Sequence, residues 1–153
     1  MDWTWLQSAD AADQLRVVSR AKFEKKRLLS PSEARFFYAA EKAIADQKLS
    51  WRVMAQVCLG EVLGSPDEAA FRAINAKRVD LLIVNNGGYP LAAIEYQGEG
   101  HYQGTAPLRD AVKKEALRRA GIGYIEMTPK HGAEDMAREI ARLAEASKAR
   151  RAV

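Results

Sequence analysis

Two apolar runs near the middle of the chain have the length and composition of β-strands. Residues 79–84 read Val-Asp-Leu-Leu-Ile-Val, residues 91–97 read Leu-Ala-Ala-Ile-Glu-Tyr-Gln, and Gly87-Gly88 lies midway between them. Glycine adopts the positive φ of tight hairpin turns, so a two-residue loop predicts antiparallel strands whose paired residue numbers sum to 175. Both faces of the first run are apolar, which indicates a central strand covered by helices on both sides.

This register places two acids opposite each other. Asp80 faces Glu95, and Gln97, two residues further on, projects from the same face of the sheet. Directly opposed residues have Cβ atoms roughly 4.5–5.5 Å apart, and two such carboxylates repel each other unless a cation or a shared proton relieves them. The pair therefore indicates a divalent metal site within otherwise apolar strands.

Periodicity and capping signals predict further elements on both sides of the hairpin. Ser30-Pro31-Ser32-Glu33 combines a capping box with proline at the first helical position, which predicts a helix over residues 30–47. Residues 51–59 alternate as a strand with Val53, Ala55, Val57 and Leu59 on one face. The remaining predictions are helices at 10–28, 65–76, 107–120 and 133–149, a strand at 122–127, Gly121 as a helix end, and a core stripe of Leu108, Val112, Ala116 and Ala120.

The order of these elements predicts an α/β domain with a mixed central sheet flanked by helices. The chain has 153 residues, 48% of them hydrophobic, which suits one domain at 28–153 preceded by an N-terminal helical extension at 1–27. The single Cys58 excludes an intrachain disulfide and a cysteine-based zinc site, and no targeting or membrane segment is visible, so we expect a cytoplasmic protein. The net charge of +4 permits a nucleic-acid partner and does not require one.

Several of these residues together resemble a known family. The matching residues are Leu28-Leu29-Ser30-Pro31-Ser32-Glu33, Val79-Asp80, Ile94-Glu95, Gly98, His101, Arg109-Asp110, Lys113 and Ala120-Gly121-Ile122. Their pattern is similar to the DUF2726 family of the PD-(D/E)xK restriction-endonuclease-like superfamily. The resemblance covers roughly residues 28–127 and implies a restriction-endonuclease-like αβββαβ core.

The resemblance also implies a metal-dependent site. Residues that match Asp80 and Glu95 bind Mg²⁺ or Mn²⁺ in the superfamily, and the backbone carbonyl of Tyr96 is expected to join them. The last motif position, usually Lys, helps to position or activate the attacking water, and here it is Gln97. A neutral amide can orient water but supplies no positive charge.

Neighbouring residues extend the predicted site. Lys113 lies at the edge of its predicted helix stripe and can replace the missing cation as a water-activating or phosphate-binding group, ahead of Lys114. Glu33 is a helix cap, and the resemblance allows it to complete the metal site. His101 is a general base, a phosphate contact or a structural loop residue, and Arg109 either pairs with Asp110 or contacts phosphate.

The predicted function is Mg²⁺-dependent hydrolysis of phosphodiester bonds, with DNA as a more probable substrate than RNA by the resemblance alone. The alternative is a catalytically inactive nuclease fold that binds nucleic acid. A protein-interaction role for the N-terminal helix, including a homodimer, is a third reading, and no membrane partner is expected.

Overall fold

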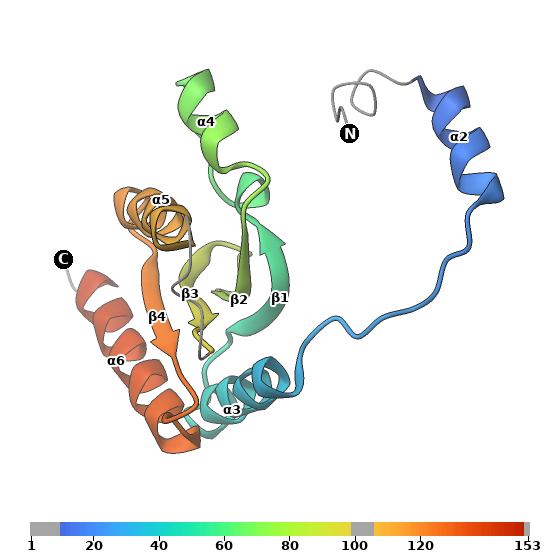
Figure 1. Ribbon diagram of the computed structural model, residues 1–153. Coiled ribbons are helices and arrows are strands. Elements are labelled where there is room, and N and C mark those ends of the chain that lie inside the picture. Colours follow the sequence, from blue (N-terminus) through green and yellow to red (C-terminus); the bar gives the residue numbers. More distant parts are fainter. Residues whose placement is uncertain (1–9, 99–105, 152–153) are drawn as a thin grey trace.

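The computed structural model describes residues 10–98 and 106–151. Its helices are α2 (Ala11–Arg20), α3 (Pro31–Asp46), the 3₁₀ helix η1 (Leu59–Glu61), α4 (Glu68–Ile74), α5 (Ala106–Arg119) and α6 (Ala133–Arg151). Its strands are β1 (Arg52–Cys58), β2 (Arg78–Val84), β3 (Pro90–Tyr96) and β4 (Gly123–Met127). The strands form one sheet in the order β1-β2-β3-β4, with β4 parallel to β3 and the other pairs antiparallel (Figure 1). The predicted mixed sheet with a central hairpin is confirmed.

Helices cover both faces of the sheet. On one face α3 and α6 pack against each other and enclose an apolar cluster that includes Phe36, Ile83 and Met136 (Figure 1). On the other face α4 and α5 cover a second cluster that includes Leu82 and Leu117. Burial of each such side chain contributes about 1.5–3 kcal/mol, so both faces stabilise the central strands on which the site is built.

The predicted two-residue hairpin loop is wrong. The Asn85 N–H donates to the Tyr89 carbonyl at 2.9 Å, so the loop contains the three residues between them. Gly88 takes a φ of +86° there, and the Asn85 side chain accepts hydrogen bonds from the Gly87 and Tyr89 N–H groups. A three-residue loop with glycine in the left-handed region is a common hairpin connection.

The predicted register is nevertheless confirmed, because a bulge compensates for the longer loop. Val84 pairs with Pro90 while Ile83 pairs with Ala92, so β3 carries one extra residue at this point. In each pair from Ile83–Ala92 to Leu81–Ile94, the two residue numbers sum to 175, as predicted.

The faces of β1 differ from the prediction. Val53 and Ala55 pack with the α3–α6 cluster, whereas Val57 and Leu59 pack with the α4–α5 cluster. The change falls at Gln56, whose φ of +54° interrupts the alternation.

Two helix predictions are also corrected. Leu108 and Val112 are 71% and 40% exposed, while Leu117 is fully buried, so the stripe predicted for α5 is wrong and the helix turns a different side to the sheet. Helix α4 begins later than predicted, because Asp67 caps it by accepting from the Ala69 and Ala70 N–H groups.

The N-terminal helix is shorter than predicted and lies apart from the sheet (Figure 1). It ends at Arg20, and residues 21–30 form neither helix nor strand before α3 begins. None of the residues of α2 is buried. No helix in residues 10–98 and 106–151 combines the length and the apolar character that crossing a bilayer requires.

Candidate functional site

Asp80 on β2 and Glu95 on β3 contact each other inside the sheet. The Asp80 N–H donates to Glu95 Oε2 at 3.2 Å, and the Tyr96 N–H donates to Asp80 Oδ2 at 2.8 Å. Each carboxylate thus accepts a hydrogen bond from a backbone N–H of the opposite strand that is not used in strand pairing. Glu95 is only 3% exposed. The hairpin therefore brings the two acids together, as the register predicts.

Asp80 holds a proton at neutral pH. Burial raises its pKa to about 8, and the adjoining carboxyl of Glu95 contributes through a hydrogen bond and charge repulsion. The Tyr96 N–H acts in the opposite direction but is outweighed. The repulsion expected between the facing acids is thus relieved by a shared proton.

Lys113 supplies the cation of the site. Its Nζ donates to Glu95 Oε1 at 2.6 Å and to the Arg78 carbonyl at 3.2 Å, and Asp110 lies 3.7 Å away. Only 16% of the Lys113 side chain is exposed. The predicted approach of Lys113 to the carboxylates is confirmed, and its role in water activation stays a prediction.

Glu33 joins the first turn of α3 to the acid pair. Its Oε1 accepts from the Ser30 N–H at 2.7 Å while its own N–H donates to Ser30 Oγ, which confirms the capping box. Its Oε2 accepts from Gln56 Nε2 at 3.3 Å, and its carboxyl also contacts that of Asp80. Partial burial tends to raise the pKa of Glu33, but the hydrogen bonds from Ser30 outweigh it and lower the pKa. Glu33 is therefore both a cap and a member of the acidic group.

Gln56 is a site residue that the sequence prediction missed. The β1–β2 pairs on either side, Ala55 with Leu81 and Val57 with Val79, place Gln56 opposite Asp80. Its left-handed backbone costs a non-glycine residue about 1 kcal/mol and is typical of functional positions. The signal in the sequence is a single polar residue inside the apolar run of residues 53–59.

Gln97 follows Glu95 at the end of β3 and is 8% exposed. Its N–H donates to the Met127 carbonyl, whereas its side-chain Oε1 is buried and has no hydrogen-bond partner among the described residues. The hydroxyl of Tyr124 on β4 is likewise buried without a partner there. An unpartnered buried acceptor costs about 1–3 kcal/mol, so Gln97 presents an oxygen that a bound molecule can satisfy.

We expect Gln97→Met to stabilise the protein without ligands by about 1 kcal/mol, because the thioether has no strong acceptor to leave unsatisfied. Urea denaturation measures the change. Gln14→Met on the exposed face of α2 is the matched control and should have no effect. A destabilised Gln97→Met variant would show that the amide is already satisfied.

The other predicted residues lie further out or outside the described residues. Lys114 is 61% exposed, 3.8 Å from Glu126 and over the Tyr124 ring. Arg109 is exposed in the first turn of α5. Tyr96 ends β3, with its ring against Phe36. His101 lies outside the described residues.

The donor set of the site suits a hard cation in part. Asp80 and Glu95 offer carboxylate oxygens and Gln97 an unsatisfied amide oxygen, which are the donor types that Mg²⁺ takes. Within residues 10–98 and 106–151, however, no three His, Cys, Asp or Glu side chains are arranged to enclose a metal ion. Any cation held here would therefore rely on two carboxylates, a neutral oxygen and oxygens from substrate or water.

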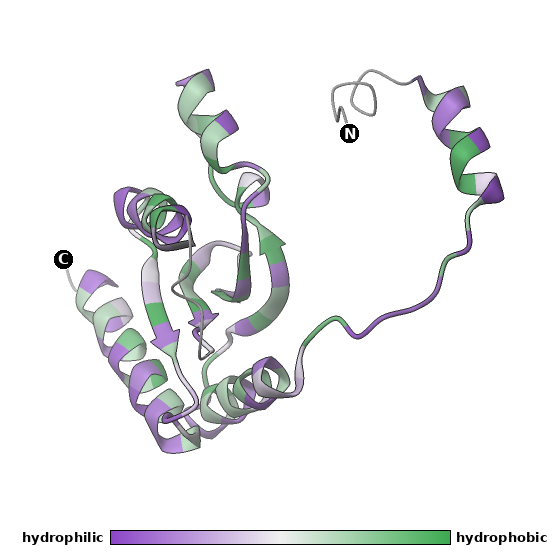
Figure 2. Ribbon diagram, viewed as in Figure 1, coloured by the Kyte–Doolittle hydropathy of each residue, from purple (hydrophilic) through white to green (hydrophobic). Residues whose placement is uncertain are grey.

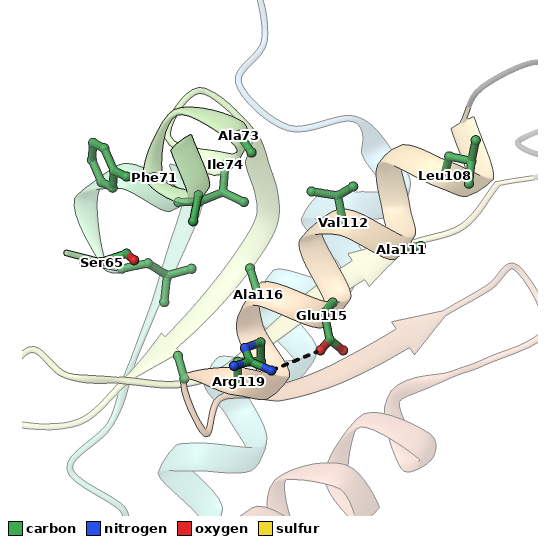
Figure 3. Close-up of a pocket in the computed structure, with 14 residues that line it drawn as sticks. Ser65, Phe71, Ala73, Ile74, Leu108, Ala111, Val112, Glu115, Ala116 and Arg119 are labelled. Atoms are coloured by element: carbon green, nitrogen blue, oxygen red, sulfur yellow. Dashed lines mark ion pairs between the residues drawn. The ribbon is translucent and has the colours of Figure 1, made fainter. Parts of the chain in front are cut away.

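A wide recess of the described surface lies elsewhere. It is a groove of about 810 Å³ between α4 and α5, with Phe71 and Ile74 on one wall and Leu108, Val112 and Ala116 on the other (Figure 3). Glu115 and Arg119 stand at its edge, joined by an ion pair (Figure 3). The groove is mostly apolar and is lined by neither Asp80, Glu95 nor Lys113, so it is not the candidate site.

Comparisons with known proteins place the chain in a family. An uncharacterized protein of Haemophilus influenzae is 45% identical over 124 residues, which cover 81% of this chain and 65% of that protein. An uncharacterized protein of Sinorhizobium fredii is 50% identical over 105 residues, or 69% of this chain and 76% of that one. The chain thus spans less than two thirds of the length of the Haemophilus relative, and no solved structure matches it. Residues 25–143 match the family described as a protein of unknown function, DUF2726, and the chain belongs to this family.

Proposed function

We propose that the protein is a metal-dependent nuclease of the PD-(D/E)xK type, which hydrolyses phosphodiester bonds in DNA. The observation that carries the proposal is the acid pair Asp80–Glu95 within the sheet, in which Glu95 is buried and its Oε1 lies 2.6 Å from Lys113 Nζ. Apart from η1 and α4, which lie between β1 and β2, the order α3-β1-β2-β3-α5-β4 is the αβββαβ order expected from the resemblance and supports the same proposal.

A purely structural role explains the pair poorly. Placing two acids together in a sheet core costs free energy, and an apolar pair would fill this position of the sheet at no such cost. A carboxyl whose pKa is strongly raised, as that of Asp80 is beside Glu95, is instead typical of functional sites. The two acids and the lysine converge from β2, β3 and α5, and the unsatisfied Gln97 oxygen lies two residues beyond Glu95 along the chain.

Asp80 and Glu95 would hold the cation, with the Tyr96 carbonyl and Gln97 Oε1 as neutral oxygens beside them. A divalent cation lowers the pKa of its bound water and offsets negative charge at the phosphorus. Asp80 must release its proton before its carboxylate can act as a ligand, so binding competes with the proton that it shares with Glu95.

Lys113 and Gln97 divide the task of the lysine that usually ends the motif. Lys113 provides the positive charge from α5 and can move from Glu95 towards a phosphate oxygen or an attacking water. Gln97 Oε1 can accept a hydrogen bond from that water and orient it. Glu33 and Gln56 position Asp80 from the opposite side.

The test is an assay of the purified full chain on single-stranded, duplex and branched DNA with Mg²⁺, Mn²⁺ or EDTA. We expect cleavage with either metal, none with EDTA, and none with Asp80→Asn under any condition. Intact DNA in every reaction, with the wild type indistinguishable from Asp80→Asn, would contradict the proposal. Metal-independent DNA binding without cleavage would identify an inactive nucleic-acid-binding module instead.

A further inference from the structure

The positive charge of the chain is concentrated in one short segment. Residues 16–27, here named the basic arm, contain six Lys or Arg and one Glu, a net charge of +5. The whole chain has a net charge of +4, so the other 141 residues together carry −1. The arm therefore carries more net positive charge than the whole domain at residues 28–153, whose 18 basic and 16 acidic residues give +2.

The cations of the basic arm are exposed and almost all unpaired. Arg16 forms an ion pair with Asp13 on α2. The other five have no ion pair with any residue that the structure describes: Arg20, Lys22, Lys25, Lys26 and Arg27. Every residue of the arm is exposed, and Figure 2 shows much of the stretch between α2 and α3 in the purple of hydrophilic residues. Like charges held this close repel each other unless a polyanion neutralises them.

The basic arm leads directly to the acidic site. Only Leu28 and Leu29 separate it from Ser30, which caps α3, and Glu33 in the first turn of α3 contacts Asp80. The arm also has the reach for this contact, because residues 21–27 form neither helix nor strand and an extended chain advances about 3.3 Å per residue. Lys25, Lys26 and Arg27 can therefore follow a phosphate backbone towards the acids.

We propose that the basic arm binds the phosphodiester backbone of nucleic acid and holds the strand at the acidic site. This inference rests on the proposed function, since it explains how a domain with a net charge of only +2 over residues 28–153 attracts a polyanion. The arm supplies the attraction, and the domain supplies the chemistry.

An anionic membrane surface is the competing partner, and the structure favours nucleic acid. A membrane-surface helix carries its cations on the polar face of one long amphipathic helix. Here only Arg16 and Arg20 lie on α2, while the other four cations follow in the segment without helix or strand. The exposed apolar residues beside them are likewise divided, with Leu15, Val17 and Val18 on α2 and Phe23 and Leu28 in that segment, instead of lining one long helix.

The test compares two variants of the full chain with equal changes of charge. The arm variant replaces Lys22, Lys25, Lys26 and Arg27 by Gln, and the control variant replaces the exposed Lys130, Lys148, Arg150 and Arg151 by Gln. Binding of a labelled DNA duplex is measured in EDTA as a function of NaCl concentration. We expect the arm variant to lose at least about tenfold in affinity and its log–log salt slope to fall by about 3 to 4, with the control close to wild type.

Each outcome is decisive for the arm. Equal losses in both variants, or an arm variant that binds like wild type, would overturn the proposal. Binding of the wild type to vesicles of anionic lipid but not to DNA would also overturn it. Circular dichroism verifies that both variants fold. If DNA binding depends on the arm but the protein does not cleave DNA in Mg²⁺, the proposed nuclease function is refuted and the proposed role of the arm stands. If the arm variant cleaves DNA and binds it with wild-type affinity, the role of the arm is refuted and the nuclease function stands.

Discussion

Asp80→Asn is expected to abolish cleavage and to stabilise the metal-free protein at alkaline pH. Loss of a carboxylate ligand should lower the rate by at least about a thousandfold. The free energy of unfolding should instead rise. At high pH the wild type must ionise Asp80 beside Glu95 in the folded state, whereas asparagine stays neutral. A gain in stability together with a loss of activity is typical of a group kept for function.

The pH dependence follows from the direction of the pKa shift. Asp80 has a pKa near 3.8 in the unfolded chain and about 8 in the folded protein, so the folded state binds more protons between these values. The stabilisation is complete below about pH 4 and is lost as the pH rises through about 8. The full shift would exceed 5 kcal/mol, but partial solvent exposure of the carboxyl reduces it to about 1–3 kcal/mol.

Urea denaturation in EDTA at pH 5 and pH 9 measures this effect. The wild type should lose stability between the two values relative to Asp80→Asn. Asp46→Asn, an exposed acid paired with Lys42, is the matched control and should follow the wild type. Parallel pH curves for the wild type and Asp80→Asn would refute the shared proton.

Lys113→Met should produce the largest loss of stability at the site. The substitution leaves the carboxylate of Glu95 buried and without its cation, which costs about 2–4 kcal/mol when one partner of a buried pair is removed. Cleavage should fall as well, because no other described cation donates to Glu95. The measurements are urea denaturation at neutral pH and the DNA cleavage assay.

The double variant Lys113→Met with Glu95→Gln separates stability from catalysis. Removing both charges should restore most of the stability while cleavage stays absent. Lys114→Met is the matched control, since Lys114 is exposed and lies near Glu126 on the surface. A stable, fully active Lys113→Met variant would remove this lysine from the site.

The acid pair could be predicted from the sequence because strand alternation is a local property. Two departures from the predicted geometry cancel each other. The hairpin loop takes one more residue from the β2 side than predicted, and the bulge between the Val84–Pro90 and Ile83–Ala92 pairs gives β3 one extra residue. The register of Asp80 and Glu95 is therefore correct although the turn is not. The capping box of α3 was equally local and is confirmed.

Features that depend on tertiary packing could not be predicted in this way. The left-handed backbone of Gln56 could not be predicted, because the residue at this position is not a glycine. This conformation moves Val57 to the other face of the sheet. The orientation of α5 follows from burial of Leu117 and from the Lys113–Glu95 ion pair. The spacing of apolar residues in the sequence instead predicts that the face with Leu108 and Val112 is buried. The contact from Gln56 to Glu33 joins β1 to α3 and has no local signature.

The parallel pairing of β3 with β4 determines when the parts of the site meet. Asp80 and Glu95 are brought together by a short hairpin, fifteen residues apart along the chain, whereas Lys113 arrives only with the crossover that carries α5. Closing the shorter segment loses less chain entropy. An early folding species with the hairpin closed and the crossover undocked therefore holds two adjoining acids without the lysine that pairs with them in the folded protein.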